Sequence, residues 1–92
     1  IGLGSNQLGY AIMTQDGTQV QLTTNGSYVS SNQGDWKASF SIAEESGFTA
    51  YWENQASSLY TSWDVNTDGS LSSWQFITED QFNSANVAET LV

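Results

Sequence analysis

The segment DVNTDGSLS, residues 64–72, has the residue types and the spacing of a calcium site. Oxygen-bearing side chains alternate along it, at Asp64, Asn66, Asp68, Ser70 and Ser72. Calcium takes six to eight oxygen ligands, and a helix-flanked calcium loop places them at alternate positions around a glycine at its sixth position, here Gly69. The same loop needs a bidentate glutamate at its twelfth position. This chain has the neutral Gln75 there.

The same segment also fits a β-hairpin turn. Asp68-Gly69 is a typical turn dipeptide, because glycine adopts positive φ without steric cost. Trp63 and Trp74 on either side fall into alternating patterns, which indicate strands where a calcium loop needs helices. The pattern therefore favours a turn in which Asp64 faces water. The alternative is a calcium site at Asp64, Asn66, Asp68 and Ser70, or one between copies that shares Asp64 or Asp68 with Glu79 or Asp80.

Three of the four tryptophans belong to apolar strand faces. Trp36, Trp52 and Trp63 each alternate with polar neighbours, and cross-strand aromatic pairs stabilise small sheets. We therefore expect these three residues in the core. The residues predicted to share their faces are Ala38, Phe40 and Ile42 beside Trp36, Ala50 beside Trp52, and Val65 beside Trp63.

Exposed aromatic side chains could instead bind a ligand. A row of flat rings forms a platform on which sugar rings stack, and tyrosine and tryptophan combine a flat apolar body with a polar tip. Tyr51 and Tyr60 fall on the polar faces of their segments. Together with Trp74 they are the predicted ligand or partner surface.

Catalysis is not predicted. The chain has no histidine and no cysteine, which excludes Ser-His-Asp triads, cysteine nucleophiles and zinc fingers. Paired carboxylates could hydrolyse glycosides, and Glu44, Glu45 and Glu53 lie close in sequence. A general acid needs a desolvated pocket, whereas these residues fall beside a turn or on a polar face. We expect a protein that is not an enzyme.

The charge balance restricts the partners. Ten acidic residues against Lys37 alone give a net charge of −9, and nucleic-acid binding requires a basic surface. No apolar run reaches the length of a membrane span, so membrane insertion is not expected. Acidity, neutral polar residues and the absence of cysteine suggest a secreted or cell-surface protein. Asn25-Gly26-Ser27 matches an N-glycosylation acceptor, although Asn-Gly is also explained by a turn.

Short alternating segments separated by turn dipeptides predict a mainly β fold. We expect one domain over residues 1–92, with an N-terminal extension at 1–7, a small antiparallel β-meander of about six strands at 8–77, and a helix and tail at 78–92. The sheet could stay open or form a half-open sandwich or barrel. Thr78 followed by Glu79 and Asp80 predicts the start of a helix over 79–91.

Several of these segments together resemble a known family, the tryptophan-rich domain of cyanobacterial and other bacterial surface proteins. The residues that carry the resemblance are Gly9-Tyr10, Gly34-Asp35-Trp36, Phe48 to Trp52, Tyr60 to Trp63, and Asn66 to Gly69. The resemblance covers residues 8–76. It implies a module of a large secreted protein, often in tandem and beside calcium-binding repeats, and it implies no catalytic residues.

The ends of the chain depart from that family pattern. The family ends in an Asp/Asn-rich segment leading into Ile-Gly, whereas this chain ends ANVAETLV and itself begins Ile-Gly. We expect a single repeat with refitted ends. The apolar termini, at Ile1, Leu3, Leu91 and Val92, could be accepted by other copies as added strands, and such a head-to-tail contact generates a filament.

Two functions follow as hypotheses. The first is a non-catalytic extracellular module that self-associates, as the subunit of a filament or surface assembly. The alternative is a carbohydrate-binding adhesion module that uses exposed aromatic residues.

Overall fold

The computed structural model of the chain describes residues 2–14, 16–30 and 32–91, and for residues 89–91 it describes the backbone alone. It confirms a mainly β fold with antiparallel sheets and one C-terminal helix. The described part of the chain contains nine strands, against about six expected. The additional strands are short or lie at the N-terminus.

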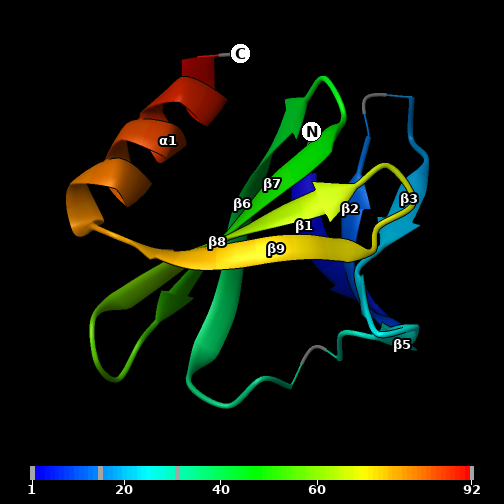
Figure 1. The fold of residues 1–92 in the computed structure, drawn as a ribbon, viewed down its shortest axis with the longest axis horizontal. Helices are drawn as coiled ribbons and strands as arrows, with labels where there is room; N and C mark the ends of the chain where they lie inside the picture. The colour runs from blue at the N-terminus through cyan, green and yellow to red at the C-terminus, as the bar shows by residue number, and fades with distance from the viewer. Residues whose placement is uncertain (1, 15, 31, 92) are drawn as a thin grey trace.

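Three antiparallel units make up the β structure (Figure 1). A three-stranded sheet has the order β1-β2-β3, a hairpin joins β4 and β5, and a four-stranded sheet has the order β6-β7-β8-β9. The elements are β1 Gly2–Asn6, β2 Gly9–Met13, β3 Gln19–Gln21, β4 Thr23–Thr24, β5 Ser27–Tyr28, β6 Trp36–Glu44, β7 Gly47–Asn54, β8 Leu59–Asn66, β9 Leu71–Ile77 and α1 Glu79–Leu91.

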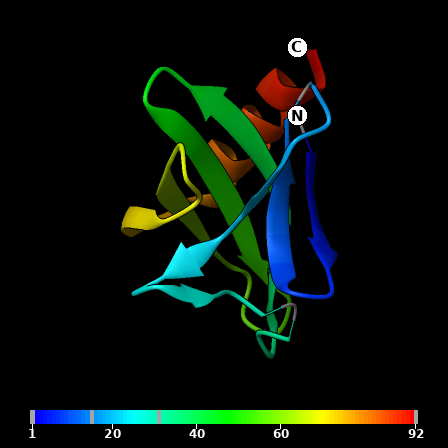
Figure 2. The same cartoon turned by 90° about the vertical axis from the view of Figure 1, so that its right-hand side faces the viewer.

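The four-stranded sheet is the middle layer of the molecule. The three-stranded sheet packs on one of its faces, which we call the inner face, and α1 packs on the other, which we call the helix face (Figure 2). The core cluster lies between the two sheets. It contains Tyr10, Ile12, Leu22, Val29, Ala38, Ala50, Trp52 and Val65.

A β-bulge in β6 changes the predicted face of Phe40. The register places Ala38 opposite Trp52 but Phe40 opposite Tyr51, because the pairing shifts by one residue at Ser39. Paired residues share a face, so Ala38 lies on the inner face and Phe40 on the helix face. The prediction that Trp36, Ala38, Phe40 and Ile42 share one face is therefore wrong beyond Ala38.

Residues 2–6 form a strand and are not an extension. Strand β1 pairs with β2 along its whole length, and Leu3 stands opposite Ile12. The Asn6 side chain closes the hairpin, since its Oδ1 accepts hydrogen bonds from the backbone N–H groups of Leu8 at 2.9 Å and Gly9 at 3.3 Å. On the four-stranded sheet, the buried Ser41 hydroxyl donates to the Gly2 carbonyl at 3.4 Å.

The predicted helix and its cap are confirmed. The Gln81 N–H donates to Thr78 Oγ1 at 3.1 Å, and the Thr78 N–H donates to Gln81 Oε1 at 2.9 Å. This reciprocal pair is a capping box, which satisfies two backbone donors at the start of α1. Phe82 is the buried anchor of the helix, with its ring centroid 5.3 Å from that of Phe40 and 4.6 Å from that of Tyr60.

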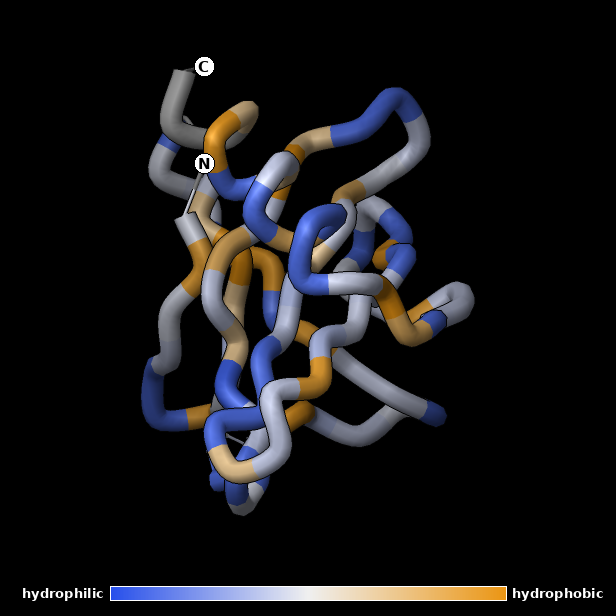
Figure 3. Tube along the Cα trace, turned by 90° about the vertical axis from the view of Figure 1, so that its left-hand side faces the viewer, coloured by the Kyte–Doolittle hydropathy of each residue, from blue (hydrophilic) through white to orange (hydrophobic). Residues whose placement is uncertain are grey.

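Three of the predicted turn dipeptides lie between paired strands: Asp16-Gly17, Asn25-Gly26 and Asp68-Gly69 connect β2 to β3, β4 to β5 and β8 to β9. Between β6 and β7 the turn is Glu45-Ser46, because Gly47 already belongs to β7 and pairs with Glu44. In Figure 3 the loops are mainly hydrophilic, whereas hydrophobic residues recur along the strands. Asn25 of the possible glycosylation acceptor is exposed at the turn between β4 and β5.

Gly69 is expected to be essential for packing as well as for the turn. Its φ is +92°, and a Cβ atom there would lie 1.9 Å from the Gln21 carbonyl oxygen. Gly17 has a similar φ of +88° with no atom within 4 Å of such a Cβ, and it serves as the control. We expect Gly17→Ala to cost about 1–2 kcal/mol from backbone strain and Gly69→Ala about 3 kcal/mol or more. Urea unfolding measures both, and equal losses would contradict the packing role.

The β2–β3 turn predicts a specific loss of stability in acid. Hydrogen bonds from the Thr14 hydroxyl and from the Thr18 backbone N–H lower the pKa of Asp16 from 3.8 to about 2. A lowered folded-state pKa contributes stability above the unfolded value, and this contribution is lost as the pH falls toward about 2. Asp16→Asn should therefore have a lower Tm than the wild type at neutral pH.

That difference in Tm should shrink as the pH falls from about 4 to about 2. Asp35→Asn removes the same charge from another exposed position and serves as the control for net charge. Thermal melting across this range measures all three proteins. A difference between Asp16→Asn and the wild type that is independent of pH would show that these hydrogen bonds are not linked to the charge.

Candidate functional site

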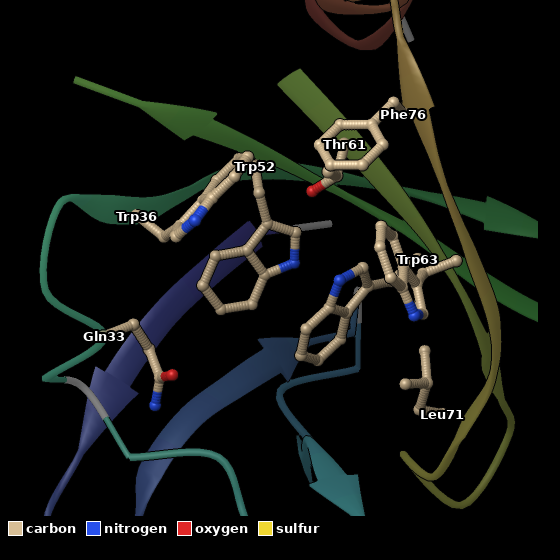
Figure 4. A pocket seen from close by; sticks show the side chains of 8 residues that line it. Gln33, Trp36, Trp52, Thr61, Trp63, Leu71 and Phe76 are labelled. Carbon is tan, nitrogen blue, oxygen red and sulfur yellow. The ribbon is translucent and has the colours of Figure 1, made fainter. Parts of the chain in front are cut away.

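All four tryptophans line one open cleft on the inner face of the four-stranded sheet. The three-stranded sheet covers only part of that face, and beside it remains a cleft of about 310 Å3 (Figure 4). Strands β6 to β9 and the loop before β6 supply its walls. The lining residues are Gln33, Trp36, Trp52, Thr61, Trp63, Leu71, Trp74 and Phe76. None of these eight described residues carries a charge.

The register of the strands explains why these side chains converge. Trp63 stands opposite Trp74, and Thr61 stands opposite both Trp52 and Phe76. Residues that pair across antiparallel strands share a face, and residues two apart along a strand share it too. A register shift in β9 at Ser72 returns Leu71 to the same face, opposite Val65.

The exposure of the aromatic rings increases step by step from the core to the solvent. Trp52 is only 2% exposed, and its ring centroid lies 5.1 Å from that of Tyr10 and 4.7 Å from that of Trp63. Trp63 and Trp36 are half-buried. Trp74 and Phe76, at 5.3 Å from each other, are 54% and 60% exposed. The prediction of core positions therefore holds fully for Trp52, whereas Trp36 and Trp63 have one side in the cleft.

Trp52 has a buried hydrogen-bond donor next to this cleft. Its buried indole Nε1 has no hydrogen-bond partner among the described residues. Figure 4 shows this nitrogen on the edge of the ring that faces Trp63. Buried indole N–H groups usually find a partner, because an unpaired buried donor costs free energy.

The predicted ligand surface of Tyr51, Tyr60 and Trp74 is split by the sheet. Trp74 lines the cleft on the inner face, whereas Tyr51 and Tyr60 are half-buried on the helix face. Tyr51 stacks on Phe40 with a centroid distance of 4.7 Å. The Tyr60 hydroxyl donates to the Glu79 carboxylate at 3.5 Å. The two tyrosines therefore belong to the packing of α1, and they do not form one surface with Trp74.

Burial and neighbouring acids both raise the pKa of Tyr51 and of Tyr60. Burial raises the pKa of Tyr51, and the charges of Glu44 and Asp64 raise it further. Burial likewise raises the pKa of Tyr60, with additional contributions from Glu79 and Glu53. Both phenols are thus neutral at physiological pH and act as hydrogen-bond donors.

The 64–72 segment forms a hairpin turn closed by its own hydrogen bonds. Asp68 Oδ1 accepts from the Ser70 N–H at 2.9 Å and from the Ser70 hydroxyl at 2.6 Å, and these bonds lower the pKa of Asp68. Asn66 Nδ2 donates to Ser70 Oγ at 3.0 Å. Asp64 is engaged elsewhere, since its Oδ2 accepts from the Ser73 hydroxyl at 2.9 Å. No group of three or more acidic side chains suited to a metal occurs among the described residues.

A second, polar pocket of about 470 Å3 lies at the end of the sheet where β6 turns into β7. Glu44 and Asp64 both line it, so the structure brings together two carboxylates that are far apart in sequence. Each carboxylate accepts a hydroxyl hydrogen bond, Glu44 from Thr49 at 3.2 Å and Asp64 from Ser73. Glu44 is among the acids considered from the sequence for glycoside hydrolysis, whereas Asp64 is not. The expectation that the chain is not an enzyme stays a prediction.

The terminal residues proposed for assembly are described in part. Leu3 is half-buried in β1, where it pairs within its own chain. Leu91 ends α1, but its side chain lies outside the described residues, as do Ile1 and Val92.

Comparison with known proteins gives no match. No family model, no curated protein and no solved structure matches the chain. The resemblance to the tryptophan-rich domain therefore stays a prediction. In the described residues, no helix has the length and apolar character needed to cross a membrane.

The 64–72 turn leads to a prediction about calcium. Only two of the four predicted ligands, Asp64 and Asp68, are charged, and no larger cluster of acidic side chains that could hold a metal ion occurs among the described residues, so we expect no stabilisation of the isolated protein at about 1 mM calcium, where weak extracellular sites bind. Thermal melting with calcium, with magnesium and with EDTA measures this. A rise in Tm that is specific to calcium and abolished in Asp68→Ala would contradict the expectation and support the metal site.

Proposed function

We propose that this protein is a non-catalytic carbohydrate-binding module that holds a neutral sugar chain in the cleft lined by its four tryptophans. In this proposal the module works outside the cell, in agreement with its composition and with its resemblance to bacterial surface modules. The observation that carries the proposal is the convergence of four indoles and Phe76 on one open, uncharged cleft.

The chemistry of the cleft suits sugars better than purely apolar ligands. A pyranose ring presents a flat C–H face that stacks on an aromatic ring, and a rim of hydroxyl groups that needs hydrogen bonds. The half-buried Trp36 and Trp63 and the exposed Trp74 offer ring surface. The half-buried Gln33 side chain, which also lines the cleft, offers polar contacts, whereas Thr61 and the unpartnered Trp52 N–H are buried. Pockets of this kind combine many apolar contacts with few polar ones that fix orientation.

The charge distribution favours a neutral ligand. A net charge of −9 repels acidic polysaccharides at long range, and no basic side chain lines the cleft to compensate. No acidic side chain lines the cleft either, so a cationic ligand has no counter-charge there. Binding of a neutral glycan should therefore depend little on salt concentration.

The alternative expectation, a filament assembled through the chain ends, receives less support. Strand β1 is paired within its own sheet, so its use as a donor strand would require this pairing to break. The cleft needs no such rearrangement, and this difference supports the proposal of carbohydrate binding over assembly through the ends.

A titration tests the proposal. Intrinsic tryptophan fluorescence should change saturably with neutral polysaccharides such as glucans, mannans or xylan, because all four indoles line the site. Trp74→Ala should raise the Kd at least about tenfold, or about 1.4 kcal/mol, since exposed tryptophans are frequent binding hot spots. Its fold should be unchanged because Trp74 is 54% exposed.

Tyr28→Ala is the matched control. Tyr28 is 56% exposed and lies outside the cleft, so its removal deletes an equally exposed aromatic ring. We expect wild-type affinity for this variant. Equal losses in the two variants, or binding of acidic polysaccharides alone, would reject the cleft as the site.

A further inference from the structure

Strand β9 is an edge strand, and beyond its register shift at Ser72 it lacks the usual protection. It ends the order β6-β7-β8-β9, and Figures 1 and 2 show it as the outermost strand on its side of the sheet. Among the described residues, β9 pairs along its length with β8 alone. One isolated bridge joins Thr23 to Ser70, the residue directly before β9. Natural proteins usually guard such edges with charges, prolines or covering segments.

The sequence of β9 offers none of these guards. No charged residue occurs between Asp68 and Glu79, and the chain has no proline. On its inner-face side β9 exposes Trp74 and Phe76, at 54% and 60%. Two copies that each carry a net charge of −9 repel one another, and this repulsion is weakest where the contacting surfaces carry no charge.

We propose that β9 pairs antiparallel with β9 of a second copy, so that the two four-stranded sheets become one continuous sheet. This goes beyond the proposed function, because the pairing needs no ligand. It adds Trp74 and Phe76 of the partner subunit to the rim of each cleft.

The side-chain pattern selects the register. When the twofold axis passes through Gln75, Trp74 of each copy stands opposite Phe76 of the partner subunit, which makes two aromatic cross-strand pairs on the inner face. A register centred on Trp74 makes one tryptophan pair and leaves both Phe76 rings opposite Ser72 of the partner subunit. The first register buries more aromatic surface and is the one we infer.

The symmetry of this contact gives a closed dimer. Both copies use the same strand, so the interface is isologous and each β9 edge is consumed. The nearest acids, Asp68 and Glu79, lie at the ends of the paired segment, so salt should strengthen the dimer by screening their repulsion.

The test uses Gln75, which is exposed and stands at the proposed axis. Gln75→Glu and Gln75→Lys each place like charges directly opposite one another in the dimer, which is destabilising. Analytical ultracentrifugation of the full chain without ligand should show a monomer–dimer equilibrium for the wild type. We expect the dimer Kd to rise at least about tenfold in each variant, and an equimolar mixture of the two to recover a tight heterodimer.

Net charge is controlled in two ways. Gln7→Glu makes the same charge change in the exposed β1–β2 turn and should keep the wild-type Kd. Gln75→Lys lowers the net negative charge, so a tighter dimer for this variant would mean that general repulsion decides association and would overturn the proposal. A wild type with a dimer Kd weaker than about 1 mM, or a mixture that fails to recover the dimer, would overturn it as well. Because no glycan is present, these outcomes are independent of the proposed function.

Discussion

The constraint on which this structure depends is that a β-strand sends successive side chains to opposite faces, while both faces of the four-stranded sheet must be packed. Strand β6 has to supply Ala38 to the core and Phe40 to the helix, two positions that strict alternation would keep together. The bulge at Ser39 resolves this conflict by shifting the register by one residue. It also turns Ser41 to the inner face, where its small, fully buried side chain lets β1 approach and its hydroxyl reaches the Gly2 carbonyl. One inserted residue therefore makes room for a layer on each side of the sheet.

The elements that could be predicted from the sequence are those with a local cause. Turn dipeptides such as Asn25-Gly26, whose residues have φ values of 51° and 81°, and the capping pair of Thr78 and Gln81 act within a few residues. Strand β1 could not be predicted, because Gly2–Asn6 has neither alternation nor β-branched residues. Its extended form comes from pairing with β2. The bulge at Ser39 likewise has no local signal, since it is set by what lies above and below the sheet.

The same limit explains what was missed at the site. Alternation placed Trp52 and Trp63 on apolar faces, but it does not tell how far a neighbouring layer extends over that face. The three-stranded sheet covers Trp52 and leaves part of Trp63 open. Trp63, which alternation predicts in the core, therefore lines a cleft instead. Conversely, alternation predicts a free polar face for Tyr51 and Tyr60, but α1 covers this face with Phe82. The sequence did hold one signal for the cleft: Trp74 and Phe76 are two residues apart and so share a face of their strand, and Trp63 lies on the neighbouring strand.

Strand β9 links the cleft to the edge of the sheet, because Trp74 and Phe76 belong to both. A sugar chain long enough to leave one cleft would meet the aromatic residues of the partner subunit next, on the same face of a continuous sheet. Any ligand that contacts both copies binds the dimer better than the monomer, and linkage then requires that dimerisation strengthen ligand binding by the same factor. A ligand short enough to stay within one cleft gains nothing from the second copy. The length of the bound chain, rather than its chemical identity, would therefore decide whether binding and association are coupled in this protein.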